Sequence, residues 1–133
     1  QLTETYTRIR ACDHLDKGRV LILAGGTGNP YFTTDTAATL RASEIKAEVL
    51  LKATNVEGVY TDDPRENKNA RMLRTLDPHD MLDQNLRVMD LTAATLSLEN
   101  KTPIIVFNVF RKGNLKRLIL GQKIGSEIRS KKK

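Results

Sequence analysis

The chain has 133 residues, of which 39% are hydrophobic and 5% aromatic, so it has the size of one domain with a mainly aliphatic core. It lacks an apolar run of about 18 residues, so we expect no membrane span, and it lacks an apolar leader, so we expect no export signal. Its lone Cys12 has no disulfide partner within the sequence, which fits a reducing compartment. The net charge is +6 and is unevenly distributed. Residues 111–133 carry nine Lys/Arg and one acid, a charge of +8, whereas residues 1–110 carry 13 Lys/Arg and 15 acids, a charge of −2. The basic residues are therefore concentrated at the C-terminal end, and the rest of the chain is not basic.

Helical and strand patterns alternate along the chain. The sequence predicts a helix over 4–16, a strand at 20–24, helices over 34–46, 76–82, 89–99 and 113–120, and strands at 49–51, 104–107 and 125–128. Three of the predicted strands are continuous apolar runs, which is typical of strands buried on both faces of a mostly parallel sheet. We therefore predict one α/β domain over 1–128, followed by a basic tail at 129–133.

Ligands of such folds bind at the carboxyl ends of the strands. This rule places the loops after Ala24, Ala53 and Phe107 on one edge of the sheet. These three loops are the first places where we expect functional residues.

The loop at 25–35 combines glycines with threonines that precede a helix. Gly25, Gly26 and Gly28 allow backbone N–H groups to turn toward a ligand, and a helix start attracts anions. The spelling is neither that of a P-loop nor that of the dinucleotide fingerprint, because Tyr31 stands where the third glycine would be. Two interpretations therefore stay open: an anion site, or a turn with a helix cap.

The second loop, residues 52–64, is long and polar. Thr54 and Asn55 follow a predicted strand, and the loop could bind a base or phosphate or be an ordinary surface loop. No metal cage is predicted, because His14 and His79 lack metal-ligand spacing with Cys12 or with each other.

Four segments together closely resemble the bacterial-type UMP kinases of the amino acid kinase superfamily. They are "GGTGNPYFTTDTAATLRASEI", "LLKATNVEGVYTDDP", "RVMDLTAATLSLEN" and "IIVFN". The resemblance runs from about Tyr6 to Ile128, and the "TGNP" motif followed by two aromatics and "TTD" is its most specific part.

The resemblance implies a three-layer α/β/α fold with a mostly parallel sheet, and transfer of the γ-phosphoryl group of Mg²⁺-bound ATP to UMP, giving UDP. It also implies a homohexamer, UTP and GTP as effectors, a role in pyrimidine nucleotide biosynthesis and a cytoplasmic location, with the plastid stroma as an alternative.

The resemblance also assigns roles to individual residues. Asp35 and Asp90 fall at acidic positions near the reacting phosphates, and Lys52 is either a charge-stabilising residue or an ordinary lysine at a strand end. The residues expected to contact ATP are Thr54, Asn55, Tyr60 and Asp63. Those expected to contact UMP are Thr27, Gly28, Asn29, Pro30, Tyr31, Phe32, Thr33 and Thr34.

Family members are nearly twice as long as this chain. Their N-terminal half contains a Lys-x-Ser-Gly loop, a Gly-Gly-Gly loop, and an Arg and an Asp that hold UMP, and none of these is present here. Glu57 replaces the more usual Asp before Gly58, and "GS" at 125–126 replaces a commoner Gly-Thr. We therefore expect this chain, as a C-terminal portion, to be inactive alone.

Two alternative functions remain. One is a non-catalytic descendant of the kinase with a regulatory, structural or RNA-binding role. RNA would bind through the basic end, although the tail lacks aromatic residues to stack on bases. The other is a different amino acid kinase, such as an acetylglutamate or aspartate kinase, against which the "TGNPYF" spelling argues.

Overall fold

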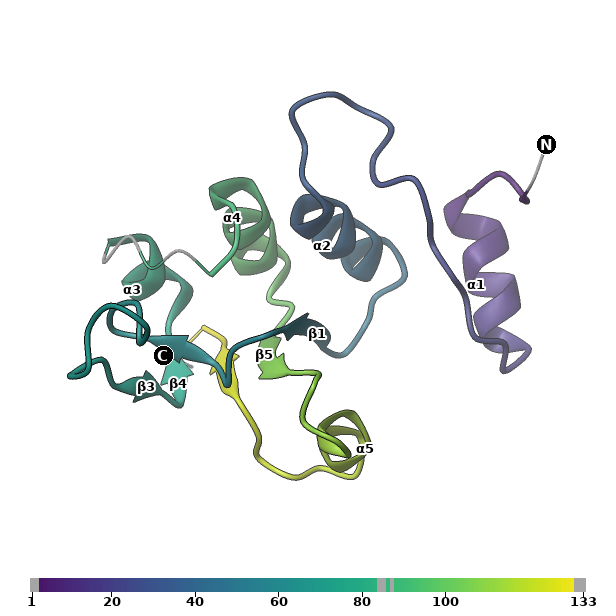
Figure 1. Cartoon of the computed structure of the whole chain (residues 1–133). Coiled ribbons are helices and arrows are strands. Elements are labelled where there is room, and N and C mark those ends of the chain that lie inside the picture. The colour runs from purple at the N-terminus through teal and green to yellow at the C-terminus, as the bar shows by residue number, and fades with distance from the viewer. Residues whose placement is uncertain (1–2, 84–85, 87, 131–133) are drawn as a thin grey trace.

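The computed structural model describes residues 3–83, 86 and 88–130. Helices and strands alternate along much of the chain (Figure 1). The helices are α1 (Arg8–Asp16), α2 (Thr34–Glu44), α3 (Pro78–Asp83), α4 (Leu91–Asn100) and α5 (Asn114–Ile119). The strands are β1 (Leu50–Thr54), β2 (Val59–Tyr60), β3 (Met72–Leu73), β4 (Thr75–Leu76), β5 (Ile104–Asn108) and β6 (Ser126–Ile128).

The main sheet has the strand order β1-β5-β6-β4. The β1–β5 and β4–β6 pairs are parallel and the β5–β6 pair is antiparallel, so the predicted mostly parallel sheet is confirmed. Strands β2 and β3 form a separate antiparallel pair. Because β1 and β5 are parallel and in register, Thr54 lies opposite Asn108, and the loops that follow these two strands lie side by side.

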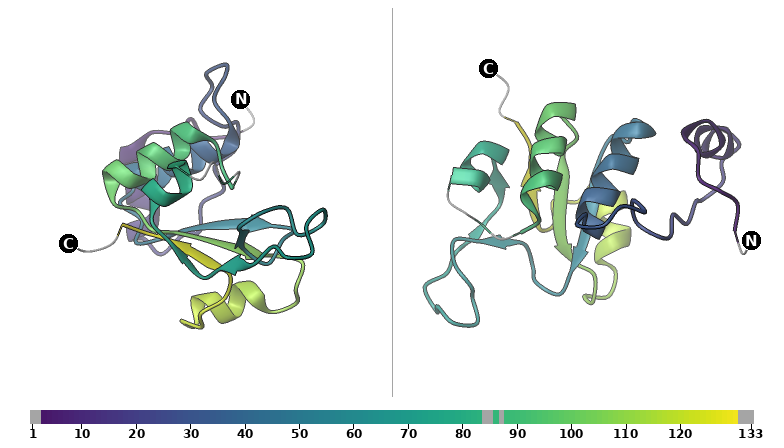
Figure 2. Two further views of the ribbon diagram at one scale, coloured as in Figure 1. Left: turned by 90° about the vertical axis from the view of Figure 1, so that its left-hand side faces the viewer. Right: turned by 90° about the horizontal axis from the view of Figure 1, so that it is seen from above.

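Helices cover both faces of the main sheet. In Figure 2, α2, α3 and α4 lie on one face and α5 on the other, which is the predicted three-layer α/β/α arrangement. The core between the helices and the sheet is aliphatic. Its buried members are Val59, Leu76, Met81, Ala94, Ile104, Val106 and Ile128.

The predicted helices all form, and their caps explain where they begin. The Thr33 hydroxyl accepts hydrogen bonds from the amides of Asp35 and Thr36, so α2 begins at Thr34. The first helix begins at Arg8 after its cap Thr7, four residues later than predicted, and ends before Gly18, which has a φ of +70°.

The predicted strand at 20–24 is wrong. Val20 and Ile22 are each 93% exposed, and no strand among the described residues pairs with this segment. A strand forms only when a neighbour takes up its backbone N–H and C=O groups. The apolar run is therefore present without the hydrogen bonds that would make it a strand.

The short strands β2, β3 and β4 were not predicted. Each has two residues, which is too short for an alternation of apolar and polar side chains to be recognised. Residues 131–133 of the predicted basic tail lie outside the described residues. In the part of the chain that the structure describes, every helix is too short or too polar to cross a membrane.

Candidate functional site

Three elements meet at one point near the carboxyl end of β1. They are the start of α2, the start of α4 and β1 itself, and side chains of α2 are bonded both to Asp90, the cap of α4, and to Lys52 of β1. The helices α2 and α4 are in contact, and both have small buried residues, Thr36 and Ala37 in α2 and Ala93 and Ala94 in α4. The predicted catalytic residues Asp35, Lys52 and Asp90 therefore lie in one region.

An ion pair connects α2 with β1. The Lys52 ammonium Nζ lies 2.6 Å from Asp35 Oδ1, and the two side chains are only 20% and 26% exposed. Lys52 and Thr54 are two residues apart on β1, so they project from the same face of the strand. The pair thus links the helix after the predicted UMP loop to the strand before the predicted ATP loop.

Asp90 caps α4 and also binds α2. Its Oδ1 accepts a hydrogen bond from the Ala93 amide at 2.9 Å, which caps α4, and another from the Thr36 hydroxyl at 2.9 Å. Its Oδ2 accepts a hydrogen bond from the Thr33 hydroxyl. One carboxylate therefore holds the starts of two helices together.

The surroundings of Asp90 favour its ionised form. Burial by itself would raise the pKa of this carboxyl, but the hydrogen bonds from Thr33, from the Ala93 amide and from Thr36 outweigh burial and lower the pKa below its ordinary value. Asp90 is thus a carboxylate at neutral pH, with both oxygens occupied by donors.

The predicted UMP loop extends from the body of the molecule, above α2 in Figure 1. Gly25, Gly26 and Gly28 all have positive φ angles, and so does Tyr31 at +70°, an uncommon conformation for a side chain of this size. The Thr27 hydroxyl accepts a hydrogen bond from the Asn29 amide at 3.1 Å, which forms a local turn.

The aromatic residues of the loop do not pack on the core. Tyr31 is fully exposed and Phe32 is 51% exposed. Asn29 is also exposed, and its side-chain amide makes a long contact of 3.5 Å with the Thr27 carbonyl. The loop therefore presents two rings and an amide to solvent, and it leads directly to the Thr33 cap of α2.

The predicted ATP residues lie in the β1–β2 loop and beyond it. The Thr54 hydroxyl donates to the Val56 carbonyl at 2.9 Å and lies 3.3 Å from the Phe107 carbonyl, so it shapes the loop. Tyr60 is half-buried in β2, and Asp63 is exposed, where its carboxylate accepts a hydrogen bond from the Arg65 amide at 2.8 Å. Asn55 is exposed at the end of β1.

Two positions at this site were not singled out from the sequence. Thr36 is buried and binds Asp90, and its position one helical turn after Thr33 was the signal that could have identified it. Asn108 ends β5, and its side-chain amide donates to Glu57 at 3.0 Å, so it joins the loops that follow β1 and β5. The rule that placed the loop after Phe107 on the ligand edge could have identified it.

The comparisons with known proteins agree on one family. The model of the amino acid kinase family matches residues 6–108. The chain is 54% identical over 128 residues to the protein named uridylate kinase PUMPKIN, chloroplastic, of Arabidopsis thaliana, with 96% of this chain and 38% of that protein covered.

Solved structures of UMP kinases have the same fold. The UMP kinase from Bacillus anthracis matches with a TM-score of 0.94 and 40% identity, over 97% of this chain and 53% of that chain. The UMP kinase from Ureaplasma parvum matches with a TM-score of 0.90 and 34% identity, over 97% of this chain and 55% of that chain. The chain thus spans about half the length of these solved relatives and 38% of the curated one.

Proposed function

The chain belongs to the amino acid kinase family, and on this basis we propose that it forms the nucleotide-binding portion of a UMP kinase. The reaction is transfer of the γ-phosphoryl group of ATP to the phosphate of UMP, which gives UDP and ADP. The observation that carries the proposal is the Asp35–Lys52 ion pair, which lies between the loop proposed for UMP and the loop proposed for ATP.

The demands of this reaction fit the charges at the site. The attacking oxygen belongs to a phosphate that is largely ionised near neutral pH, so little base catalysis is needed. The chief task is to align two polyanions and to neutralise the charge that builds up between them. Lys52 supplies a cation, and the start of α2 supplies the positive end of a helix dipole.

Asp35 and Asp90 have different parts in this proposal. Asp35 orients the Lys52 ammonium toward the phosphates through the 2.6 Å contact. Asp90 keeps the start of α2 fixed by accepting hydrogen bonds from Thr33 and Thr36. We therefore propose that Asp90 is a positioning residue in this chain. Both of its carboxylate oxygens already accept hydrogen bonds, which suits positioning better than proton transfer.

The exposed loop that contains Asn29 is the proposed acceptor site. Its amide and hydroxyl groups offer hydrogen bonds to a base and ribose, and its two aromatic rings offer stacking surfaces. The proposed contacts to UMP are Thr27, Gly28, Asn29, Pro30, Tyr31, Phe32, Thr33 and Thr34. The proposed contacts to ATP are Thr54, Asn55, Tyr60 and Asp63.

Mg²⁺ enters this proposal as part of the substrate Mg-ATP. The described residues contain no group of three carboxylate, histidine or cysteine side chains that could hold a metal ion by themselves. Mg²⁺ commonly keeps several waters and binds to substrate phosphates and one or two carboxylates. Asp35 fits such a contact, because it is half-buried at the site and has a second carboxylate oxygen beside the one that binds Lys52.

Assembly, regulation and location complete the proposal. We propose a homo-oligomer, a hexamer as the resemblance implies, with UTP and GTP as effectors and a role in pyrimidine nucleotide biosynthesis. The plastid stroma is the proposed compartment, because the Arabidopsis relative carries the word chloroplastic in its name.

A coupled assay of UDP formation tests the proposal. The chain alone is expected to turn over UMP negligibly, because it spans only about half of the solved UMP kinases. Activity is expected when the remaining part of a UMP kinase is supplied, and acetylglutamate and aspartate are expected to be inactive as acceptors. Robust turnover by the chain alone would contradict the expected inactivity, and a lack of UDP formation by a folded complex would contradict the proposed reaction.

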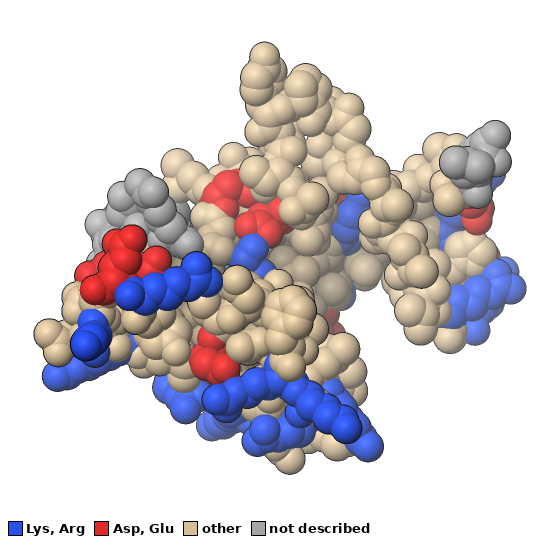
Figure 3. Space-filling model, viewed as in Figure 1, with Lys and Arg blue, Asp and Glu red and all other residues tan. Residues whose placement is uncertain are grey.

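One surface favours a second candidate function, the binding of single-stranded RNA. Lys and Arg side chains gather in the lower part of Figure 3, where α5 lies. Phe110, which directly precedes Arg111 in the sequence, is 81% exposed. The cations around α5 are Arg111, Lys112, Lys116, Arg117 and Lys123. Binding to an RNA oligonucleotide that weakens steeply with salt and is lost in Phe110→Ala would support this function, and salt-independent or absent binding would exclude it.

A further inference from the structure

Glu57 reaches from the β1–β2 loop to the segment that follows β5. The Asn108 side-chain amide donates to Glu57 Oε1 at 3.0 Å, and the Arg111 guanidinium Nε lies 3.0 Å from the same oxygen. The Glu57 side chain is 34% exposed, so it is partly shielded from water at this junction. The proposed reaction does not use this carboxylate, although it belongs to the loop proposed for ATP.

Asn108 is a firmly held partner for Glu57. Its side-chain oxygen accepts a hydrogen bond from the Phe110 amide at 2.9 Å, which leaves the NH₂ group for Glu57 and for the Asn55 carbonyl, 3.4 Å away. Its backbone carbonyl accepts a hydrogen bond at 2.9 Å from the side chain of Asn114, which is buried at the start of α5. Glu57 is therefore bonded to a side chain that is fixed between β5 and α5.

The two ends of the β1–β2 loop are fixed, but its middle depends on side chains. At the start of the loop, the Thr54 carbonyl accepts a hydrogen bond from the Val109 amide at 3.1 Å. At its end, the Val59 amide donates to the buried Ser126 hydroxyl at 2.8 Å. In the part of the chain that the structure describes, no backbone-to-backbone hydrogen bond involves residues 55–58. Such a segment keeps a single shape only where side chains hold it.

The charge of Glu57 argues against direct contact with the nucleotide. A free carboxylate in a loop that binds ATP would repel the triphosphate. Arg111 offsets this charge, and Asn108 takes up the same carboxylate oxygen. A side chain engaged in this way suits holding the loop better than binding a polyanion.

We propose that Glu57 is a positioning residue for the donor nucleotide, which keeps residues 55–58 in the shape that binds ATP by attaching them to Asn108 and Arg111. The proposal rests on the proposed function, because it takes the β1–β2 loop as the ATP loop. A loop that is ordered before ATP arrives removes a cost that binding would otherwise include. Loss of the Glu57 contacts should therefore weaken ATP binding and spare UMP binding.

The first test measures the loop of the full chain without nucleotide. Relaxation of ¹⁵N nuclei should give backbone order parameters near about 0.85 for residues 55–58 in the wild type, and below about 0.6 in Glu57→Ala. Glu57→Gln keeps an oxygen that accepts from Asn108 and should stay close to the wild type. The midpoint of urea unfolding should be the same in all three proteins, because Arg111 is 71% exposed and an exposed ion pair adds little to global stability.

The second test measures nucleotide binding by isothermal titration of the same proteins with Mg-ATP and with UMP. Glu57→Ala should raise the Kd of ATP about fivefold, because only a fraction of the molecules then has the loop in its binding shape. The Kd of UMP should change less than about twofold. Glu57→Gln should return the Kd of ATP to within about twofold of the wild-type value.

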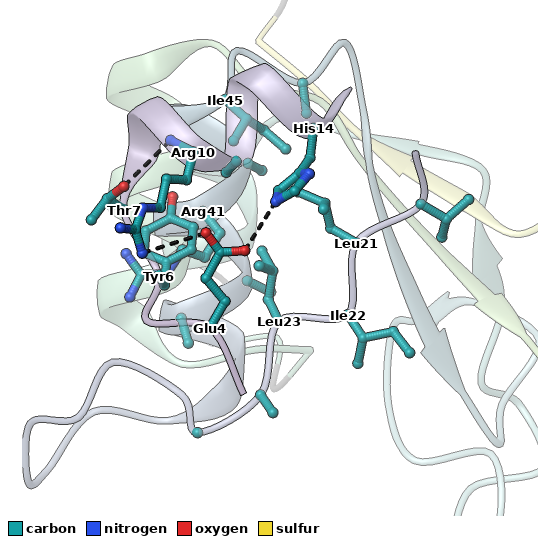
Figure 4. A pocket seen from close by; sticks show the side chains of 18 of the residues that line it. Glu4, Tyr6, Thr7, Arg10, His14, Leu21, Ile22, Leu23, Arg41 and Ile45 are labelled. Atoms are coloured by element: carbon teal, nitrogen blue, oxygen red, sulfur yellow. Dashed lines mark hydrogen bonds and ion pairs between the residues drawn. The ribbon is translucent and has the colours of Figure 1, made fainter. Parts of the chain in front are cut away.

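The matched control is Glu4→Ala. Glu4 likewise has an arginine and a second nitrogen as partners, Arg10 at 3.4 Å and His14 at 3.0 Å. Figure 4 shows this cluster beside a cleft of about 970 Å³, which is lined by residues of α1, segment 19–26 and α2, and by none of residues 55–58. This variant should therefore leave the order of the ATP loop and both Kd values unchanged.

Three results would overturn the proposal. They are unchanged order parameters in Glu57→Ala, an unchanged Kd of ATP in a variant whose loop has become mobile, and an equal rise in the Kd of ATP in Glu4→Ala. Failure of the wild-type chain to bind Mg-ATP would instead contradict the proposed ATP site. The order parameters would still decide whether Glu57 holds the loop, because they are measured without nucleotide.

Discussion

Lys52 on β1 and Asp35 on α2 are 17 residues apart in the sequence, and their charged groups lie 2.6 Å from each other in the fold. Both side chains are largely shielded from water, in contrast to exposed ion pairs such as Lys17–Asp13. The contact fixes the start of α2 against the strand that leads to the proposed ATP loop.

Replacing Lys52 by Met should destabilise the fold and abolish most turnover. The Asp35 carboxylate would remain partly buried without its cation, and we expect a loss of about 1–2 kcal/mol in urea unfolding. In an active complex we expect a fall in kcat of about 100-fold, because the proposed function places this cation opposite the transferring phosphate. Lys52→Arg keeps the positive charge and should retain part of the stability and part of the turnover.

The matched control is Lys17→Met. Lys17 pairs with Asp13 at 2.7 Å, but both side chains are more than half exposed. We expect its unfolding free energy to change by less than about 0.5 kcal/mol. Equal losses in the two variants would show that shielding of the Asp35–Lys52 pair has no energetic effect.

The stability of the chain should depend on the ionisation of Asp90. Its pKa is lowered in the folded state, so its stabilising effect is complete at neutral pH, starts to fall as the pH drops through the ordinary value of about 3.9, and is lost below the lowered pKa. Asp90→Asn should therefore give a flatter acid limb than the wild type in thermal unfolding between about pH 5 and 3. Thr36→Val, which removes one donor, should lie between the two.

Local sequence signals were sufficient for most of the elements. The apolar run at 104–107 has both faces covered by helices in the structure, and the predicted cap Asp77 is where the sequence placed it, with its carboxylate accepting from the His79 amide. These features depend on residues that are near each other in the chain. Polarity and glycine content likewise identified the two loops as candidates, without deciding between a site and a turn.

Long-range features could not be predicted in this way. Segment 20–24 has the composition of a strand, but whether it forms one depends on a partner that its own residues cannot specify. The contacts of Asp90 with Thr33 and Thr36 join residues 57 and 54 positions apart, and they arise only once α2 and α4 pack together. The sequence indicated the residue types at the site, whereas packing decided which of them meet.

Replacing Gly125 by Ala should destabilise the fold severely. Gly125 has a φ of +77°, and a Cβ at this position would lie 2.0 Å from the Val106 carbonyl oxygen in the neighbouring strand. The left-handed conformation alone costs about 1–2 kcal/mol for alanine, and the clash should bring the total to about 3 kcal/mol or more in urea unfolding.

Gly121→Ala separates the two contributions. Gly121 has a similar φ of +82°, but a Cβ there would meet open space. We expect only the conformational cost of about 1–2 kcal/mol. If the two alanine variants had the same stability, the contact of Gly125 with β5 would not be as close as described.

Replacing Asn29 by Ala should weaken UMP binding more than ATP binding. The side chain is exposed, and its 3.5 Å contact with the Thr27 carbonyl is too long to hold the loop, so the variant should fold normally. Loss of one hydrogen bond to UMP should raise its Kd about tenfold, whereas the Kd of ATP should change less than about twofold. Isothermal titration with each nucleotide measures both Kd values.

The matched control is Asn100→Ala. Asn100 lies at the opposite end of α4 from Asp90, so this variant removes an exposed amide away from the loop and should leave both Kd values unchanged. Equal weakening of UMP and ATP by Asn29→Ala would mean that the loop does not belong to the acceptor site.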